Sequence, residues 1–284
     1  MSIDSTWLRC PNCTLPLAAV GDRVVGCAEG HRFDLSKYGT VTLLPPRAPQ
    51  TVGDSREMLD ARAALLGSGV FEPIAAAIGE ACAPRALDAP DPLRIADLGC
   101  GTGYYAARLA ADFPGAALLL ADRSPIAVRI ASKAVPNATG VVLDLWRPLP
   151  IRDGIADVAI NVFAPRNAVE FARILRPGGS LIVVVPSERH LEQLRTRGGM
   201  LDIPGGKAEQ VGEQLVRAEF GLDASRRVEY LAPLGPAHVR ALVAMGPSAH
   251  HVTKGADAAG SADLDSGATI DVTVSVDVLR FRRT

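Results

Sequence analysis

No stretch of this 284-residue sequence stays apolar for the roughly 18 to 20 residues that a membrane-spanning helix needs. The N-terminus also lacks the basic start, apolar segment and small-residue cleavage site of a secretory signal. From these two absences we expect a cytoplasmic protein with no membrane segment. The formal net charge is −1, so the chain has no general basic excess, and any RNA-binding surface has to be local.

Cysteine is scarce as well: the sequence contains five, which argues against a disulfide framework in a cytoplasmic chain. Three of the five lie within the first 27 residues. Cys10 and Cys13 form a Cys-x2-Cys pair, and thirteen residues later Cys27 and His31 form a Cys-x3-His pair. Three thiolates and one imidazole are a set that tetrahedral zinc prefers. Because four protein ligands leave no position for an activated water, we predict a structural zinc site.

The pattern of residues divides the chain into three parts. Residues 1–45 contain short extended pieces and turns with too little apolar material to fold unaided, so we expect a zinc ribbon there. Residues 46–90 begin with a proline-rich linker and continue with helical spacing, which indicates a helical bridge. Residues 91–284 alternate apolar runs with helical segments and form the third unit. Its expected strands are Ile95–Leu98, Ala117–Ala121, Gly140–Leu143, Ala156–Val162, Ser180–Val185, Arg226–Leu231 and a last one from Thr269 to Phe281.

This alternation is typical of a parallel sheet with crossover helices, and the last strand fits an antiparallel addition. The segment from Asp97 to Gly103 ends a strand, turns through Gly99, Gly101 and Gly103, and opens a helix. Such a turn lets the backbone approach a ligand closely. We predict a cofactor site at this turn.

Two further acids follow the next strands. Asp122 comes about twenty residues after the glycine turn, where a carboxylate accepts hydrogen bonds from ribose hydroxyls. Asp144 follows the third strand and is a candidate for holding the adenine edge. Gly101-x-Gly103-x-x-Ala106 also satisfies the dinucleotide fingerprint, so the motif by itself does not separate adenosylmethionine from a nicotinamide cofactor. The absence of Gly-Lys-Ser/Thr excludes a P-loop.

Taken together, these features resemble class I adenosylmethionine methyltransferases, and more closely the RlmA family of 23S rRNA guanine-N1 methyltransferases with its tylosin-resistance, TlrB-like actinobacterial branch. Besides the Cys/His set, the resemblance rests on Phe33-Asp34, Lys37–Leu44, Gly53-Asp54-Ser55, Met58, Ala61-Arg62, Asp97–Tyr105, Asn161–Asn167, Arg189-His190-Leu191 and Met245–Ser248. It implies a Rossmann-like, mostly parallel seven-stranded sheet with an antiparallel last strand, and S-adenosylmethionine as cofactor. It also implies a homodimer whose ribbon recognises a hairpin of 23S rRNA.

The resemblance assigns roles to single residues. It implies that Phe71, the backbone of Gly101 and Thr102, and His190 contact the cofactor. Arg62 and Tyr38 become candidates for substrate contact. Phe71 stands where a tyrosine is common in the family, so stacking is retained and a hydroxyl contact is lost.

The chemistry restricts the substrate pocket. Guanine N1 lies on the Watson–Crick edge, so the base has to leave its pair before it reacts. A polar group at the end of the fourth strand of a doubly wound sheet faces the cofactor, so Asn161 and the carbonyl groups up to Pro165 are candidates for lining the pocket. No residue stands out as the general base, although Asp144 and Asp157 are possible.

Two alternatives remain open at this stage. In the first, the chain is a methyltransferase that acts on another RNA or on a small molecule instead of 23S rRNA. In the second, it is a zinc-dependent RNA-binding protein with an inactive methyltransferase domain. An enzyme for a small molecule would not need the ribbon as a second recognition module. The intact acids and glycines of the cofactor site argue against a methyltransferase domain that has lost its activity. The sequence leaves open which guanine is methylated and whether macrolide resistance follows.

Overall fold

A computed structural model describes residues 3–45, 54–88, 92–195, 205–245 and 269–284. Residues 251–267, whose Gly, Ala, Ser and Asp content predicts a loop, and the motif residues Gly53 and 246–248 lie outside this part of the chain. Within it, no single helix is long and apolar enough to cross a membrane, and the only two helices that pass such a test together are bent by 82° where they meet.

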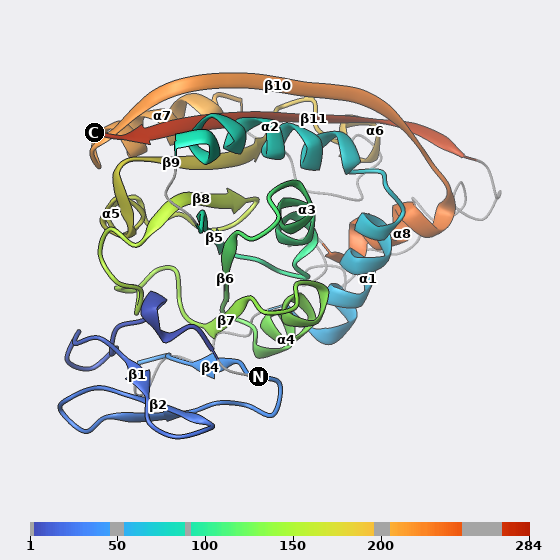
Figure 1. Cartoon of the computed structure of the whole chain (residues 1–284). Helices are drawn as coiled ribbons and strands as arrows, with labels where there is room; N and C mark the ends of the chain where they lie inside the picture. The colour runs from blue at the N-terminus through green and yellow to red at the C-terminus, as the bar shows by residue number, and fades with distance from the viewer. Residues whose placement is uncertain (1–2, 46–53, 89–91, 196–204, 246–268) are drawn as a thin grey trace.

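The centre of the molecule is a sheet of eight strands in the order β10-β11-β9-β8-β5-β6-β7-β4 (Figure 1). Its strands are β4 (Val41–Thr42), β5 (Arg94–Leu98), β6 (Ala117–Asp122), β7 (Thr139–Val142), β8 (Ala156–Val162), β9 (Leu175–Pro186), β10 (Phe220–Leu234) and β11 (Ile270–Arg283). Strand β11 is antiparallel to both of its neighbours, and the other pairs are parallel. The expected mostly parallel sheet with an antiparallel last strand is confirmed, and β4 adds an eighth strand to the seven predicted.

Helices connect and cover the strands. They are α1 (Arg56–Gly67), α2 (Glu72–Asp88), α3 (Tyr104–Asp112), α4 (Pro125–Ala134), α5 (Ala168–Ile174), α6 (Glu192–Arg195), α7 (Lys207–Val216) and α8 (Pro236–Met245). Local sequence fixes several starts: the Ser124 side chain accepts a hydrogen bond from the Ala127 N–H, and Pro125 fills the first turn of α4. Ser55 caps α1 in the same way, so both helices begin beside the glycine turn with satisfied ends.

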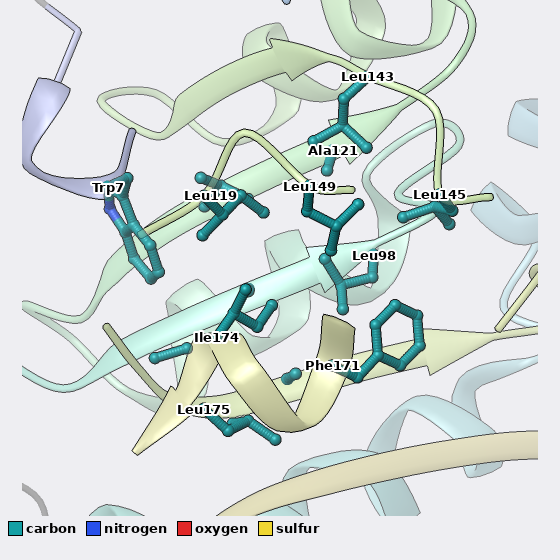
Figure 2. Close-up of a cluster of buried hydrophobic side chains, with 14 of the residues drawn as sticks. Trp7, Leu98, Leu119, Ala121, Leu143, Leu145, Leu149, Phe171, Ile174 and Leu175 are labelled. Carbon is teal, nitrogen blue, oxygen red and sulfur yellow. The ribbon is translucent and has the colours of Figure 1, made fainter. Parts of the chain in front are cut away.

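The sheet buries both faces because side chains alternate along each strand. Leu119 and Ala121 of β6 join one apolar cluster, which also contains residues of α5 and α7, while Leu118 and Leu120 join a second cluster with α1, α2, α3, α4 and α8. The first cluster extends into the N-terminal segment. Figure 2 shows Trp7 of that segment next to the strand that carries Leu119. The N-terminal unit therefore takes the place of a covering helix on this face.

The N-terminal unit contains a 3-10 turn η1 (Ser5–Trp7) and a three-stranded antiparallel sheet of β1 (Ala18–Ala19), β2 (Val24–Gly26) and β3 (Arg32–Asp34). Arg152 fixes it to the large sheet by donating hydrogen bonds to the carbonyl oxygens of Leu8 (2.9 Å) and Leu17 (2.8 Å). The Arg94 guanidinium lies 4.2 Å from the centre of the Trp7 ring on the same side. The hydrogen bonds of Arg152 and the cation–π contact of Arg94 with Trp7 thus hold the two units together.

Candidate active site and metal centre

The four predicted metal ligands converge in the N-terminal unit. One donor atom each from Cys10, Cys13, Cys27 and His31 lies within 4.8 Å of the others. The Cys13 and Cys27 sulfurs are 3.5 Å apart, and the Cys27 sulfur is 3.3 Å from Nδ1 of His31. A tetrahedron with Zn–S bonds of about 2.3 Å has edges of about 3.8 Å, so this cluster has the right size for zinc. The site holds a structural zinc ion, because all four positions belong to the protein.

The glycine turn connects β5 to α3 at the carboxyl edge of the sheet. Gly99 has a φ of 97°, and a Cβ atom there would lie 2.4 Å from Cβ of Ala164. Gly103 has a φ of 80° and lies against α4, where a Cβ atom would be 2.7 Å from Cα of Ala131. Both positions need a residue without a side chain, and the close packing leaves the backbone around Gly101 and Thr102 as the surface that faces a ligand.

Two carboxylates lie at this turn. Asp122, at the end of β6, accepts hydrogen bonds from the Gly101 N–H (3.0 Å) and the Ser124 N–H (2.8 Å), one on each oxygen. Burial raises its pKa. Because each carboxylate oxygen has a second acceptor position, Asp122 can also accept from a pair of ribose hydroxyls. Its geometry therefore fits an adenosyl ligand.

Asp97 is the more unusual acid of the two. Only 3 % of its surface is exposed, and none of the described residues donates a hydrogen bond to its carboxylate. Burial, with a smaller contribution from the charge of Asp122, raises the pKa of Asp97 to about 8. A buried carboxylate without partners is costly unless a cation reaches it. S-adenosylmethionine carries an ammonium and a sulfonium charge, so the donor set suits this cofactor.

The third acid, Asp144, lies after β7. It forms an ion pair with Arg123 and accepts a hydrogen bond from the Trp146 N–H at 3.0 Å. Asp144 is thus near the end of the strand that follows Asp122, as the sequence order requires, and Arg123 is a neighbour that the sequence pattern did not indicate. The carboxylate already has two partners, which makes it a poor candidate for a general base.

Asp157, the other acid considered for that role, lies elsewhere. It is fully buried at the amino-terminal end of β8, where it pairs with Arg85 (3.0 Å) and Arg176 (2.9 Å) and accepts the Arg94 N–H. A group at this edge of the sheet is remote from the glycine turn. The structure therefore removes Asp157 from the candidates for the proton acceptor.

Phe71 and His190 are brought together, and a third ring joins them. The Phe71 and His190 ring centres are 6.5 Å apart in an edge contact, and Phe163 stacks on His190 at 6.0 Å with an angle of 26°. Burial lowers the pKa of His190 to about 4, and its Nδ1 accepts the Ser275 N–H at 3.2 Å. His190 is therefore a neutral ring near pH 7, held between two aromatic side chains.

Asn161 lies at the end of β8 and is fully buried. Its amide nitrogen donates to the carbonyl oxygens of Leu98 and Pro165, each at 2.9 Å, while its Oδ1 atom has no partner among the described residues. The amide therefore ties the glycine turn to the 163–165 loop. Because the Pro165 carbonyl oxygen accepts this hydrogen bond, it points toward the Asn161 side chain and not into an open pocket.

The two predicted substrate contacts have different surroundings. Arg62 of α1 pairs with Asp54 and lies at the glycine turn, since a Cβ atom on Gly101 would be 3.4 Å from its Nη1 atom. Tyr38 instead lies between the N-terminal unit and α4. The cationic groups of Lys37, Arg129 and Lys133 are 5.2, 5.4 and 5.8 Å from the centre of its ring. Arg62 thus belongs to the cofactor end of the site, and Tyr38 to a basic surface.

A cavity that the sequence did not indicate opens at the carboxyl ends of β8 and β9. Its volume is about 210 Å³, and Phe163, Arg166, Pro186 and Lys207 line it. Phe163 lies within the Asn161–Asn167 motif, which by itself assigned no role to the Phe163 side chain. The sequence signal that could have indicated it is an aromatic residue directly after an expected strand and before Ala164-Pro165.

Two family models match the chain. The model described as RlmA, N-terminal, matches residues 8–49, and the model described as a methyltransferase domain matches residues 95–179. The first contains the four metal ligands, and the second begins within β5 and contains the glycine turn, Asp122 and Asn161.

Curated relatives match over most of the chain. A 23S rRNA (guanine(748)-N(1))-methyltransferase from Streptomyces fradiae is 42% identical over 245 residues, which is 86% of each protein. A provisionally named 23S rRNA (guanine-N(1)-)-methyltransferase from Micromonospora griseorubida is 38% identical over 289 residues, or 97% of each.

Solved structures are more distant. A SAM-dependent methyltransferase from Geobacter sulfurreducens in complex with S-adenosyl-L-homocysteine is 18% identical, with a TM-score of 0.46 over 74% of this chain and 90% of the other. The identity and coverage of the curated relatives, together with the ribbon match, are decisive. This chain belongs to the RlmA family of 23S rRNA (guanine-N1)-methyltransferases, and it is an enzyme of the S-adenosylmethionine-dependent class.

Proposed function

We propose that this enzyme methylates N1 of a guanine in a hairpin of 23S rRNA, and that the guanine is the one numbered 748 in the name of the Streptomyces fradiae relative. The observation that carries the proposal is the 42% identity to that relative over 86% of both chains. In this proposal residues 1–45 recognise RNA, residues 46–90 form a bridge and residues 91–284 carry the chemistry. A homodimer and macrolide resistance belong to the same proposal.

The cofactor end of the site is formed by the glycine turn and its neighbours. When bound, S-adenosylmethionine supplies a methyl group that its sulfonium charge activates. Asp122 holds the ribose, the backbone of Gly101 and Thr102 faces the ligand, and Asp97 provides the compensating negative charge. Phe71 and His190 close the site with apolar ring surface, and Asp144 lies at the adenine end. These roles are supported by the hydrogen bonds to Asp122 and by the buried carboxylate of Asp97, which accepts no hydrogen bond from the described residues.

Asn161 acts as a positioning residue in this scheme. Its amide holds the Leu98 and Pro165 carbonyl groups, so it fixes the distance between the cofactor turn and the loop that carries Phe163. Methyl transfer requires donor and acceptor in line, and small displacements of either are expensive. An Asn161→Ala enzyme that keeps wild-type turnover would remove this assignment.

The basic surface at Tyr38 is the proposed contact for the RNA backbone. Lys37 and Tyr38 come from the N-terminal unit, while Arg129 and Lys133 come from α4, so the surface spans both units. Within the described part of the chain, none of the three cations forms an ion pair. Uncompensated cations around one aromatic ring are suited to phosphate groups.

The test uses ribosomal RNA from cells that lack the gene and from the same cells complemented with it. N1-methylguanine blocks base pairing, so reverse transcription should stop next to guanine 748 only in the complemented cells. Purified enzyme should produce the same stop on a transcript of that hairpin. A stop at a different guanine would correct the position, and the absence of any stop would refute the proposed function.

A further inference from the structure

The order of the strands divides the carboxyl edge of the sheet into two halves. The chain runs from β5 to β6 and β7 in one direction, and β8 and β9 lie on the other side of β5. Ligands of doubly wound sheets bind at this switch point. Asp97, Gly101 and Asp122 occupy the β5–β6 half, so the methyl acceptor has to approach from the β8–β9 half.

The cavity lined by Phe163, Arg166, Pro186 and Lys207 lies in that second half. Phe163 is 43 % exposed although it is aromatic, and its φ of 52° lies in the left-handed region. Such a backbone conformation is uncommon for a bulky residue and is typical of functional sites. The turn places an aromatic ring at the cavity wall, next to the rings of His190 and Phe71 at the cofactor end.

Two cations lie at the other side of the same cavity. Arg166 donates to the Ala164 carbonyl at 3.2 Å, and its Nε atom is buried without a partner in the described part of the chain. Burial lowers the pKa of Arg166, and burial together with the charge of Arg166 lowers the pKa of Lys207. No carboxylate of the described residues pairs with either group. Two partly buried like charges without a counter-ion favour an electron-rich ligand.

We propose that this cavity receives the target guanine, that Phe163 stacks on the base, and that Arg166 and Lys207 hold its O6 atom as negative charge develops there. The proposal rests on the function proposed above. Loss of the N1 proton to water leaves a lone pair on N1 and shifts charge onto O6. N1 then bonds to the methyl carbon, the C–S bond breaks, and its electron pair stays on sulfur. The two cations stabilise the anionic base from which this step starts.

Other charged groups near Lys207 belong in the design of the test. Glu188 lies close to Gly205, and Glu209 lies close to Gly206, in each case next to the start of α7. His190 stacks on Phe163 and is neutral above about pH 4. None of these groups replaces the positive charge that a Lys207→Met variant removes.

The experiment measures methylation of the hairpin transcript by Phe163→Leu, Arg166→Met and Lys207→Met enzymes, with Arg217→Met at the end of α7 as a matched loss of charge. We expect the Phe163 variant to raise KM for RNA about 10-fold, because base–aromatic stacking is lost. The two cation variants should lower kcat about 10-fold or more. The two cation variants should bind S-adenosylmethionine like the wild type in calorimetry, and Arg217→Met should change nothing.

The pH profile separates a chemical role from a structural one. Lys207→Met should move the rising limb of kcat to higher pH, because the bound base then gives up its N1 proton less readily. Rates equal to Arg217→Met, or a loss of cofactor affinity that matches the loss of rate, would overturn the cavity assignment. If wild-type enzyme forms no N1-methylguanine, the proposed function fails first, which keeps the two failures distinct.

Discussion

At the scale of single residues, Asp97 and His190 show how a site prepared for a cationic ligand differs from the rest of the core. Both side chains are buried, and burial favours the neutral form of each. It raises the pKa of the Asp97 carboxyl to about 8 and lowers that of the His190 ring to about 4. The two pKa values therefore shift in opposite directions. The stability of the ligand-free enzyme should fall both toward alkaline pH, through Asp97, and toward acidic pH, through His190.

Asp97 should limit stability at alkaline pH. Its carboxyl titrates near 3.8 in the unfolded chain and near 8 in the folded one, so its contribution is complete below 3.8 and is lost as pH rises through 8. An Asp97→Asn enzyme should melt at a higher temperature than wild type at pH 8, and should bind S-adenosylmethionine at least about tenfold more weakly because a charge is lost. Scanning calorimetry and titration measure the two effects. Asp112→Asn on α3 is the control, and equal cofactor affinity would contradict the role of Asp97.

His190 should act at the acidic side. Its pKa is lowered from 6.5 to about 4, so its contribution is complete above 6.5 and is lost as pH falls through 4. A His190→Gln enzyme should lose less stability than wild type between pH 6.5 and 4, although it starts lower because the contacts with Phe71 and Phe163 change. Urea unfolding at several pH values gives the slopes. Parallel slopes for the two proteins would show that His190 is not the titrating group.

At the scale of elements, the N-terminal unit depends on its metal. Residues 8–45 have four short strands, and their buried apolar side chains belong to the cluster of the large sheet and do not form a separate core, so metal binding has to supply much of their folding free energy. Removal of zinc by a chelator, or a Cys27→Ser substitution, should unfold β1, β2 and β3 and abolish RNA binding. Cofactor binding at the glycine turn should remain.

Amide hydrogen exchange of the full chain measures whether β1, β2 and β3 unfold when zinc is removed. Zinc added back to the chelated wild type should restore protection over residues 8–45, and zinc added to Cys27→Ser should not. Unchanged exchange in the chelated enzyme would show that packing against the large sheet, and not the metal, holds the unit together.

Elements with a local signature could be predicted from the sequence, and elements defined by distant pairing could not. Strand β8 spans Ala156–Val162 as expected, because every residue in it is buried and all but Asp157 and Asn161 are apolar. Strand β10 is longer than its predicted core at Arg226–Leu231, because its exposed residues carry no apolar alternation and are held by pairing with β11. Strand β4 has two residues and forms because β7 is available beside it.

The same distinction applies to the site. The glycine turn, Asp122 and the metal ligands each follow from spacing along the chain. Arg166 lies between β8 and α5, and Lys207 begins α7, 41 positions later. Both line one cavity only because the chain brings α7 back beside β9. No local pattern carries that information. The chain-order argument for Asn161 correctly placed it at the end of β8, but the pairing of its amide could be read only from the structure.

At the scale of the whole molecule, the RNA contact proposed above lies on a surface shared by two units, although the net charge of the chain is −1. Arg129→Ala and Lys133→Ala should each weaken binding of the hairpin and reduce the slope of log K against log salt by about 1. Turnover at saturating RNA should stay near wild type, because α4 is not at the proposed base cavity. Fluorescence anisotropy at several salt concentrations measures the slope.

A charge on the opposite edge of the sheet provides the comparison. Arg226 of β10 is exposed and pairs with Glu80, so Arg226→Ala removes a positive charge far along the strand order from β4 and β7. It should leave both affinity and salt slope unchanged. An equal reduction for Arg226→Ala and Lys133→Ala would mean that the effect reflects overall charge and not the Tyr38 surface.

The pairing of Val41 with Val141 has a consequence for the order in which the enzyme is made. A ribosome synthesises β4 about one hundred residues before its partner strand β7. The nascent ribbon can therefore bind its zinc ion while β4 is still unpaired. Closing so long a loop is slow relative to local folding. The ribbon, the segment proposed to recognise RNA, is therefore complete early, and it pairs in register with the large sheet only after β7 has emerged.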